Sequence, residues 1–356
     1  LNLEVKQMQS RLWKFLIFAG ISGLVLMLAF NQPGRFADGR SIRQAPGERA
    51  ITIALVPMGT TDEYWRAVYA GAVSASRELG VALVFQGPMR RDDRSAQLDV
   101  VDAMVVRQVD AIVLAPIDNM ALRGPVEDAY RSSIPVIVID SDLQSDRTAS
   151  FIRTDNYKAG FMAGEHLAGL LNHHGRVALL RGVEGNASTD HRERGFLDAL
   201  AAYPEITLVS SSQHGGGTSE TAYKASENIL APLKGSDGKI ALDGVFCPNE
   251  STTFGMLRAL EDSGLGGSVR FVGFDFSPKL LDALEKGTID ALVAQDPVRM
   301  GYLGIKAAAQ KVRQPELTLE PVVDVPATIV TRQNMTEPQV KSLVRPNLRI
   351  IDGVGD

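Results

Sequence analysis

The chain has almost no cysteine. Cys247 is the only one in 356 residues, so no disulfide can form within the chain. A single thiolate also cannot build the cysteine-rich ligand set of a structural zinc site. The cysteine count therefore excludes both kinds of covalent or metal support and does not reveal the redox compartment.

An excess of positive charge is lacking as well. Lys and Arg number 37 against 42 Asp and Glu, which gives a net charge of −5, and the sequence has no basic cluster. A protein that follows phosphates needs such a cluster, so we expect no nucleic-acid partner. Apolar residues make up 45% and charged residues 22% of the chain, which favours a folded globular protein over a disordered one.

The motifs of several enzyme classes are missing. The sequence has no P-loop, no GxGxxG after a strand, no GxSxG and no HExxH. His173 and His174 are adjacent, so one helix cannot turn both toward a single metal ion. We therefore expect no enzyme, no cofactor and no metal site. One alternative stays open, because two carboxylates such as Asp140 and Asp275 could in principle cleave a glycoside.

The amino-terminal stretch combines positive charge with a short apolar run. Two cations precede the uncharged residues 15–30, and a Pro-Gly pair follows them. This pattern is typical of an export signal, so we expect residues 1–30 to direct the chain to the periplasm or another extracytoplasmic location. Two outcomes stay open, a cleaved signal peptide and an uncleaved membrane anchor over residues 15–34. Residues 31–50 have no periodicity and are predicted to be a linker.

From residue 51 onward, short β-rich runs alternate with amphipathic helical stretches. Four strand-helix units come first, and a second series begins with a helix after residue 160. The pattern predicts an α/β protein of two doubly wound parallel-sheet lobes, joined by a multi-crossover hinge with a ligand cleft between them. The predicted strands cover residues 51–57, 81–86, 111–116, 135–140, 176–182, 207–212, 244–249, 269–275, 290–296 and 327–331.

The two lobes are expected to be discontinuous in the sequence. The length of 356 residues suits two domains, and a late helix and strand could cross back between them. We expect residues 51–154 with about 296–324 in the amino-terminal lobe, and residues 155–295 with about 325–346 in the carboxy-terminal lobe. Residues 347–356 are expected to be a tail.

One stretch marks the place of a ligand. Residues 269–275, VRFVGFD, are predicted to be a buried strand with Asp275 at its carboxyl end. In open α/β sheets, ligands bind outside the carboxyl ends of the strands, which makes this acid a candidate ligand contact. The alternative is an Asp that caps the helix beginning after Ser277 and Pro278.

Motifs spread over the body of the chain resemble one family. They occur in the order YWRAVYAGAVSASRELG, PVIVID, RTDNYKAG, HRERGFLDAL, VFCPNE, GMLRAL, VRFVGFD and VAQDP. From residue 51 to about 346 the chain is similar to the ribose-binding-protein group of bacterial periplasmic sugar-binding proteins, with the type I periplasmic binding protein fold. Effector domains of lactose-repressor-like transcription factors share this fold, but a helix-turn-helix precedes them. Here an apolar segment stands in that place.

The resemblance implies a sugar site in the cleft. In that group, aromatic rings lie on the apolar faces of the sugar, and charged or amide side chains bind its hydroxyls. Carried over position by position, the expected ligand-binding residues are Asp62, Tyr64, Trp65, Asp140, Ser141, Arg192, Asn249, Asp275 and Gln295.

Alternatives remain for five of these residues. Tyr64 and Trp65 could simply belong to the core, although adjacent positions do not share one helix face. Arg192 could lie on a solvated helix face. Asn249 could cap the helix after it, and Gln295 could form a hinge hydrogen bond.

The chain departs from the group at three places. Ser141 stands where the ribose group has an arginine, and Asp62 stands where an Asn is usual. The loop 215–217 consists of glycines and lacks the aromatic residue that closes the far face of the sugar ring. We therefore expect a ligand other than ribose, with room at this loop for a larger molecule or for a backbone contact.

The charges of the expected site favour a neutral ligand. Three acids, Asp62, Asp140 and Asp275, face one cation, Arg192. Such a pocket disfavours sugar phosphates and accepts neutral polyols or amino sugars.

The resemblance implies an extracytoplasmic solute-binding protein. It would close on a sugar or sugar-like molecule and present it to the membrane permease of an ATP-driven importer. The alternative is a membrane-anchored sensory protein that signals the ligand to a kinase or chemoreceptor. The expected partners are therefore a sugar or polyol and either an ABC transporter permease or a membrane sensor.

Overall fold

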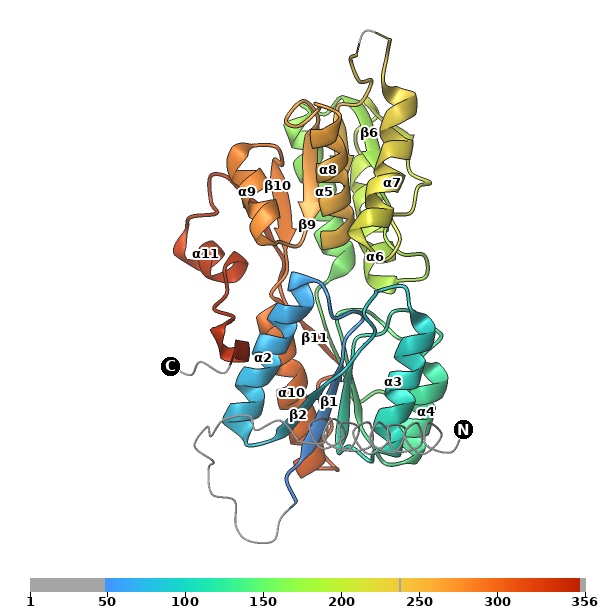
Figure 1. Cartoon of the computed structure of the whole chain (residues 1–356), viewed down its shortest axis with the longest axis vertical. Coiled ribbons are helices and arrows are strands. Elements are labelled where there is room, and N and C mark those ends of the chain that lie inside the picture. The colour runs from blue at the N-terminus through green and yellow to red at the C-terminus, as the bar shows by residue number, and fades with distance from the viewer. Residues whose placement is uncertain (1–48, 237, 353–356) are drawn as a thin grey trace, which may run out of the picture. The chain divides into compact units, whose positions relative to one another are not determined.

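The computed structural model describes residues 49–236 and 238–352 (Figure 1). Within them, twelve strands form two six-stranded sheets that define two lobes. The sheet of the first lobe has the order β11 (Val322–Asp324), β5 (Ser150–Arg153), β4 (Val136–Ile139), β3 (Ala111–Leu114), β1 (Thr52–Val56) and β2 (Ala82–Phe85). The sheet of the second lobe has the order β12 (Thr328–Thr331), β10 (Ala291–Ala294), β9 (Arg270–Phe274), β8 (Gly244–Phe246), β6 (Gly175–Leu179) and β7 (Ile206–Ser210).

Helices cover both faces of the first sheet. Helices α2 (Glu63–Leu79) and α10 (Pro297–Arg313) pack on one face, and α3 (Arg94–Val106) and α4 (Arg123–Arg131) pack on the other (Figure 1). Successive strand residues point to opposite faces, so Ile53 and Leu55 of β1 join the α2 side while Ala54 and Val56 join the α3 side. Strands buried on both faces explain the continuous apolar runs in the sequence.

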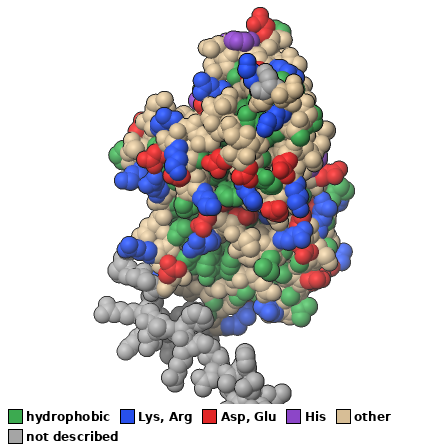
Figure 2. All heavy atoms as spheres, turned by 45° about the horizontal axis from the view of Figure 1, so that its top comes forward, with side chains coloured by type: hydrophobic (Ala, Val, Ile, Leu, Met, Phe, Trp, Pro, Cys, Tyr) green, Lys and Arg blue, Asp and Glu red, His purple; other side chains and the backbone are tan. Residues whose placement is uncertain are grey.

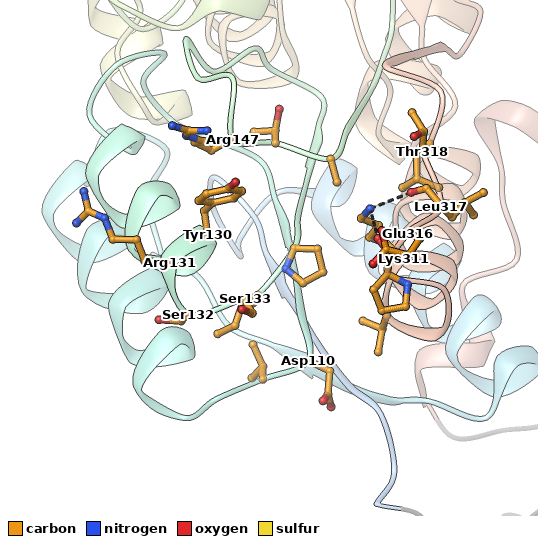
Figure 3. Close-up of a pocket in the computed structure, with 18 of the residues that line it drawn as sticks. Asp110, Tyr130, Arg131, Ser132, Ser133, Arg147, Lys311, Glu316, Leu317 and Thr318 are labelled. Atoms are coloured by element: carbon orange, nitrogen blue, oxygen red, sulfur yellow. Dashed lines mark hydrogen bonds between the residues drawn. The ribbon is translucent and has the colours of Figure 1, made fainter.

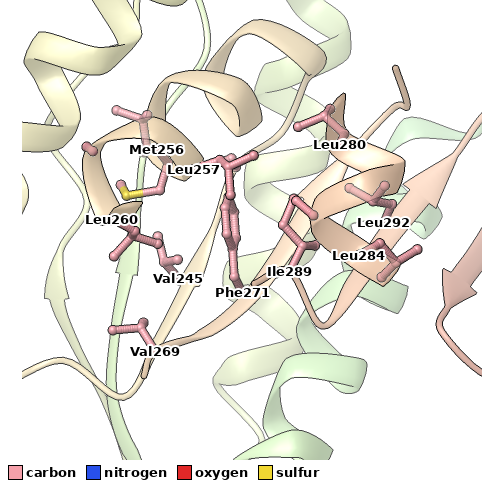
Figure 4. Packing of buried hydrophobic residues seen from close by; sticks show 14 of the residues in the cluster. Val245, Met256, Leu257, Leu260, Val269, Phe271, Leu280, Leu284, Ile289 and Leu292 are labelled. Carbon is pink, nitrogen blue, oxygen red and sulfur yellow. The ribbon is translucent and has the colours of Figure 1, made fainter. Parts of the chain in front are cut away.

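The second sheet is covered in the same way. Helices α5 (Asn156–Leu170) and α6 (Ala187–Leu200) pack on one face, and α7 (Ser219–Leu230), α8 (Glu250–Asp262), α9 (Pro278–Lys286) and α11 (Pro338–Val344) pack on the other. Short 3₁₀ turns occur at Ala231–Leu233 and Arg349–Asp352. Figure 4 shows Phe271 of β9 between Leu257 of α8 and Ile289. All strand pairs except the antiparallel pair β10 and β12 are parallel, which confirms the predicted fold class.

Each lobe contains one helix pair in very close contact. A Cβ atom built on Gly71 of α2 or Gly301 of α10 would lie 1.8 or 1.9 Å from a backbone carbonyl oxygen of the facing helix. In the second lobe, Gly160 of α5 and Gly195 of α6 have the same relation, at 1.9 and 2.1 Å. Because real Cβ atoms do not approach oxygen so closely, both helix pairs depend on glycine at the crossing.

The first sheet has two strands that the sequence pattern did not predict. β5 is only four residues long and runs directly into the cap of α5, so it leaves little strand signal of its own in the sequence. β11 is three residues long and lies at the sheet edge, and it shows little of the apolar signal of a buried strand. The expected four strand-helix units therefore describe the first sheet incompletely.

The chain crosses between the two sheets three times. The crossings follow β5, follow β10, and join β11 to β12. A further segment leaves α11 of the second lobe and returns to α2 of the first, where Arg77 Nη2 donates to the backbone oxygen of Ile350 at 3.0 Å. Several crossings of this kind form the predicted hinge.

Candidate functional site

Two aspartates occupy matching positions in the two lobes. Asp140 follows β4 and Asp275 follows β9, each at the carboxyl end of a strand inside its sheet. Both have left-handed backbone conformations, with φ of 67° and 66°, and their exposed fractions are only 4% and 2%. Left-handed conformations are uncommon for residues other than glycine, and they cluster at functional sites. The two strand ends therefore bring a buried carboxylate from each lobe to the same region.

Tyr64 binds the first of these acids. Its hydroxyl donates to Asp140 Oδ1 at 2.5 Å, and burial together with Asp140 raises the pKa of the phenol well above its ordinary value. The phenol therefore stays protonated and remains a donor. Trp65 lies beside it with the two rings edge to face, 5.0 Å between centroids, and is fully buried in the first-lobe core. Both aromatic side chains are thus buried, although they are adjacent in sequence.

Asp275 is held by its own lobe. Gln295 Nε2 donates to Asp275 Oδ1 at 2.7 Å, and the backbone N–H of Glu250 donates to Oδ2 at 3.2 Å. Ser277, not Asp275, caps α9. Burial raises the pKa of the Asp275 carboxyl, and the Arg192 guanidinium opposes that shift.

Arg192 is buried rather than solvated. Its side chain leaves α6, donates from Nε to Asn156 Oδ1 and from Nη1 to the Pro248 carbonyl, both at 2.8 Å, and lies 3.8 Å over the Phe274 ring. The amide of Asn156 in turn donates to the backbone oxygen of Asp140 at 3.4 Å. The alternative of a solvated helix face is thus excluded, and Arg192 is fixed between the two strand ends.

Two charged residues that the sequence did not single out join the site. Arg91, from the loop after β2, donates from Nε to Asp62 and lies 5.7 Å over the Trp65 ring. Glu250, the first residue of α8, accepts from the backbone N–H of Tyr64 at 3.2 Å. Burial, Asp62 and Asp275 raise the pKa of Glu250 to about 8, while Arg91 opposes the shift. The site therefore contains two guanidiniums rather than one.

Only one of these two residues had a usable signal in the sequence. Glu250 directly follows Asn249 at the end of a strand, so the rule for strand ends could have included it. Arg91 stands in the mixed run RRDDR, which is typical of a solvated loop.

The other expected residues lie at the same edge. Asn249 caps α8, accepting from Thr252 N at 2.9 Å, so its carboxamide oxygen has the alternative role considered above. Ser141 Oγ accepts from the backbone N–H of Ser188 at 3.2 Å, across the two lobes. Six of the nine expected residues lie at or just after strand ends or before a helix, Tyr64 and Trp65 lie in the first turn of α2, and Arg192 lies within α6. Their contact with a ligand stays a prediction.

The glycine loop is not an open space. A Cβ on Gly215 would lie 2.6 Å from Thr252 Cγ2, and one on Gly217 would lie 2.6 Å from Asp92 Cγ. The glycines let the loop approach these side chains closely, so the room that we expected for a larger ligand is taken by the protein itself.

The lobes touch each other around the site. Asn186 Nδ2 of the second lobe donates to the Ile117 carbonyl of the first at 3.3 Å, and Arg94 Nη2 of the first donates to the Glu184 carbonyl at 2.8 Å. Together with the Tyr64–Glu250 and Ser188–Ser141 bonds, these contacts enclose a set that we call the interlobe polar cluster. It consists of Asp62, Tyr64, Arg91, Asp140, Arg192, Glu250, Asp275 and Gln295.

Three buried polar atoms at this cluster lack a hydrogen-bond partner among the described residues. They are Arg91 Nη2, Gln295 Oε1 and the neighbouring Trp65 Nε1. Leaving a buried polar group unpaired costs about 1–3 kcal/mol. Two unpaired donors and one unpaired acceptor next to six charged side chains are a fitting environment for a neutral molecule rich in hydroxyl groups.

A large cavity lies far from the interlobe polar cluster, and its size alone would make it a candidate ligand site. A cavity of about 1060 Å³ lies at the opposite, amino-terminal ends of the first-lobe strands, near Asp110, Tyr130, Arg147 and Lys311 (Figure 3). Two of the charged groups there are already paired, since Lys311 Nζ donates to the Pro315 and Leu317 carbonyls and Asp110 accepts from Thr52 N. Ligands of parallel α/β sheets bind at the carboxyl ends, which favours the interlobe cluster.

Comparison with known proteins decides the family. The periplasmic binding protein domain matches residues 53–316 of this chain. The chain belongs to the periplasmic binding protein family. The D-ribose/D-allose-binding protein of Pseudomonas aeruginosa is 29% identical over 289 residues, which cover 78% of this chain and 88% of that protein. The ribose import binding protein of Escherichia coli is 27% identical and covers 77% of this chain and 89% of its own length.

Solved structures show the same fold. A carbohydrate transporter solute-binding protein from Agrobacterium radiobacter, in complex with D-arabinose, has a TM-score of 0.77 at 32% identity and covers 83% of this chain and 99% of its own. A solute-binding protein of an ABC transporter from Agrobacterium vitis, with bound D-fucose, has a TM-score of 0.77 at 30% identity, with coverage of 82% and 99%. These relatives are named as binding proteins rather than enzymes, in agreement with the expectation from the missing motifs.

Other expectations concern the rest of this periplasmic binding protein. Residues 1–30 and 15–34, the predicted signal or anchor, lie outside the described residues. In the described part of the chain, no helix is both long enough and apolar enough to span a membrane, and the described residues contain no group of three or more His, Cys, Asp and Glu that could hold a metal ion. On the face shown in Figure 2, cationic and anionic side chains are interspersed, without a large region of one sign.

Proposed function

We propose that this periplasmic binding protein closes on a neutral monosaccharide or related polyol and presents it to an ATP-driven importer. The observation that carries the proposal is the interlobe polar cluster with its unpaired Arg91 Nη2 and Gln295 Oε1. These groups come from both lobes, so a ligand that satisfies them stabilises the closed arrangement. Relatives named for ribose import and for carbohydrate transport support the importer.

Each lobe would supply a different part of the ligand shell. Tyr64 and Trp65 offer aromatic surface for the apolar face of a sugar ring, while Asp140 and Asp275 offer acceptors for its hydroxyls. The full proposed contact set is Asp62, Tyr64, Trp65, Asp140, Ser141, Arg192, Asn249, Asp275 and Gln295, with Arg91 and Glu250 added from the geometry.

A neutral ligand also suits the charges. Four carboxyl groups, of Asp62, Asp140, Glu250 and Asp275, face the guanidiniums of Arg91 and Arg192. Because these carboxyl groups outnumber the guanidiniums, a ligand that carried a phosphate would add further negative charge to a buried region.

Calorimetric titration tests the binding. The full purified chain is titrated with D-ribose, D-allose, D-arabinose, D-fucose and D-tagatose, and we expect a dissociation constant of about 1 μM or below for at least one of them. Asp275→Asn should abolish that binding, because one oxygen that accepts from the Glu250 N–H or the Gln295 amide is replaced by a donor. Asp282→Asn is the matched control, since Asp282 is exposed and forms an ion pair with Lys286 on the surface of α9. Silence across the panel from a folded chain would overturn the proposal.

Uptake tests the importer. In cells that lack this protein, accumulation of the radiolabelled sugar identified by titration should fall to background and return with the wild-type chain. If the chain binds the sugar but does not restore uptake, the proposed role in import is contradicted and only the proposed sugar binding remains.

A further inference from the structure

The guanidinium of Arg91 is held in place with one nitrogen free. Its Nε donates to Asp62, its plane lies near the Trp65 ring, and its side chain is only 11% exposed. Nη2 is buried and has no hydrogen-bond partner within the described residues. The ion pair with Asp62 is made by Nε and orients the guanidinium, so the buried Nη2 is oriented but unused.

Glu250 approaches this guanidinium from the other lobe. It stands at the first position of α8, and Oε2 accepts from the N–H of Tyr64 in the first turn of α2. The charged groups that face it are Asp62 and Arg91 of the first lobe and Asp275 of its own. Glu250 therefore closes, from the second lobe, the same end of the site that Arg91 closes from the first.

We infer that Arg91 and Glu250 together grip one hydroxyl group of the bound sugar and thereby determine which sugars this protein accepts. The hydroxyl oxygen accepts from Arg91 Nη2, and the hydroxyl hydrogen is donated to the Glu250 carboxyl. Either protonation state of Glu250 has an oxygen that can accept. This inference rests on the proposed sugar binding and adds the selection of a particular hydroxyl position.

The same geometry rejects other substituents at that position. A hydrogen in place of the hydroxyl would leave Nη2 unpaired, and sites built to bind a hydroxyl discriminate strongly against the analogue that lacks it. An anionic group there would meet the Arg91 guanidinium but also the carboxyls of Asp62 and Glu250. The clamp therefore selects a neutral hydroxyl over both.

A role limited to structure is the competing explanation. Arg91 could merely balance the charge of Asp62, in which case its replacement would weaken the binding of every ligand alike. The quantity that separates the two explanations is the coupling free energy between Arg91 and one hydroxyl of the ligand. A double-mutant cycle measures it, with the Arg91 substitution as one change and removal of the hydroxyl from the sugar as the other.

The experiment uses the full chain and calorimetric titration. The probes are whichever of D-ribose, D-allose, D-arabinose and D-fucose binds the wild-type chain most tightly, and the set of its monodeoxy analogues. The variants are Arg91→Lys, which keeps the charge but loses the fork, and Glu250→Gln. Arg258→Lys serves as control, because Arg258 is exposed, pairs with Glu220 and Asp262, and lies over the Tyr223 ring outside the interlobe polar cluster. Thermal unfolding verifies that each variant is folded.

We expect Arg91→Lys to weaken binding of the parent sugar by about 10- to 100-fold. One monodeoxy analogue, and only one, should bind the wild-type chain and Arg91→Lys equally well, and Glu250→Gln should reduce discrimination at the same ring position. Equal losses for every analogue, or unchanged affinity, would overturn the clamp while leaving sugar binding intact. Absence of binding by the wild-type chain would overturn both.

If Arg91→Lys is unfolded, Glu250→Gln decides alone. This substitution is nearly isosteric and keeps an oxygen for the Tyr64 N–H. A loss of discrimination at a single ring position supports the clamp, and unchanged discrimination at all positions contradicts it.

Discussion

The two lobes use one scaffold but supply different chemistry. Each has a six-stranded sheet, a helix pair in contact through two glycines, and a buried Asp with positive φ at the end of a strand. Around Asp140, however, the first lobe places aromatic rings, Tyr64 and Trp65. Around Asp275, the second lobe places an amide and charged groups, including Gln295 and Glu250. The shared features position the strand ends, and the features that differ would give the proposed site an aromatic side and a hydrogen-bonding side.

The largest expected effect is the loss of sugar affinity when Arg192 is removed from the second lobe. Arg192→Ala removes a buried cation and leaves Asn156 Oδ1 and the Pro248 carbonyl without their donor. We expect sugar affinity to fall by about 1000-fold, or about 4 kcal/mol, because a broken buried charge network costs this much. Titration with the sugar that binds the wild-type chain measures the loss. Arg194→Ala, on the same helix but exposed, is the control, and equal affinities of the two variants would remove Arg192 from the site.

The next effect concerns stability and the close helix pair that both lobes share, here α2 and α10 of the first lobe. A Cβ on Gly301 would lie 1.9 Å from the Val68 carbonyl, so Gly301→Ala must push α10 away from α2. We expect a loss of about 3 kcal/mol in the free energy of unfolding, measured by urea denaturation. Gly124→Ala, in the helix α4, is the matched control, because a Cβ there meets no atom within 4 Å. If Gly301→Ala lost no more unfolding free energy than Gly124→Ala, the two helices would be able to separate without cost, and the prediction would be wrong.

Sequence reasoning found the scaffold more completely than the site. The strand ends were visible because buried parallel strands leave apolar runs that stop at a polar residue, as at Asp140 and Asp275. Arg91, close to the rim in sequence, was not among the expected ligand contacts because its burial depends on Asp62 and Trp65, which leave no local signal in the run RRDDR. β11 was missed for a similar reason, since a three-residue edge strand takes its conformation from β5 beside it. Properties set by distant parts of the chain are those that the local pattern could not supply.

A smaller effect is the pH dependence of the free energy of unfolding that Glu250 of the second lobe causes. The pKa of Glu250 is raised from 4.5 to about 8 in the folded chain. Between these values the folded state binds more protons than the unfolded state, so the free energy of unfolding must fall as pH rises through this window. The groups that face Glu250 are Asp62, Arg91 and Asp275, and they are present in the wild-type chain and in Glu250→Gln alike.

The difference between these two chains isolates Glu250. From pH 5.5 to pH 8.5, we expect the wild-type chain to lose about 2 kcal/mol more than Glu250→Gln, measured by urea denaturation at each pH. Asp275 also has a raised pKa and is present in both chains, so the difference between the two pH profiles reports the titration of Glu250 together with its coupling to Asp275. Parallel pH profiles for the two chains would show that Glu250 is not buried as a carboxyl group between the lobes.

The smallest expected effect concerns the segment that returns from the second lobe to the first. Arg77 Nη2 donates to the Ile350 carbonyl from an exposed position, and a cavity of about 370 Å³ lies between α2, α9 and residues 344–348. A segment with an unfilled cavity beside it and one exposed hydrogen bond contributes little packing energy. A chain that ends at Arg345 should therefore lose about 1 kcal/mol or less in urea denaturation and keep its sugar affinity. Adding Arg77→Ala to this shortened chain should change nothing further. If sugar affinity changed by 10-fold or more, this prediction would be wrong. The segment after α11 would then act as a fourth connection between the lobes that limits how far they open.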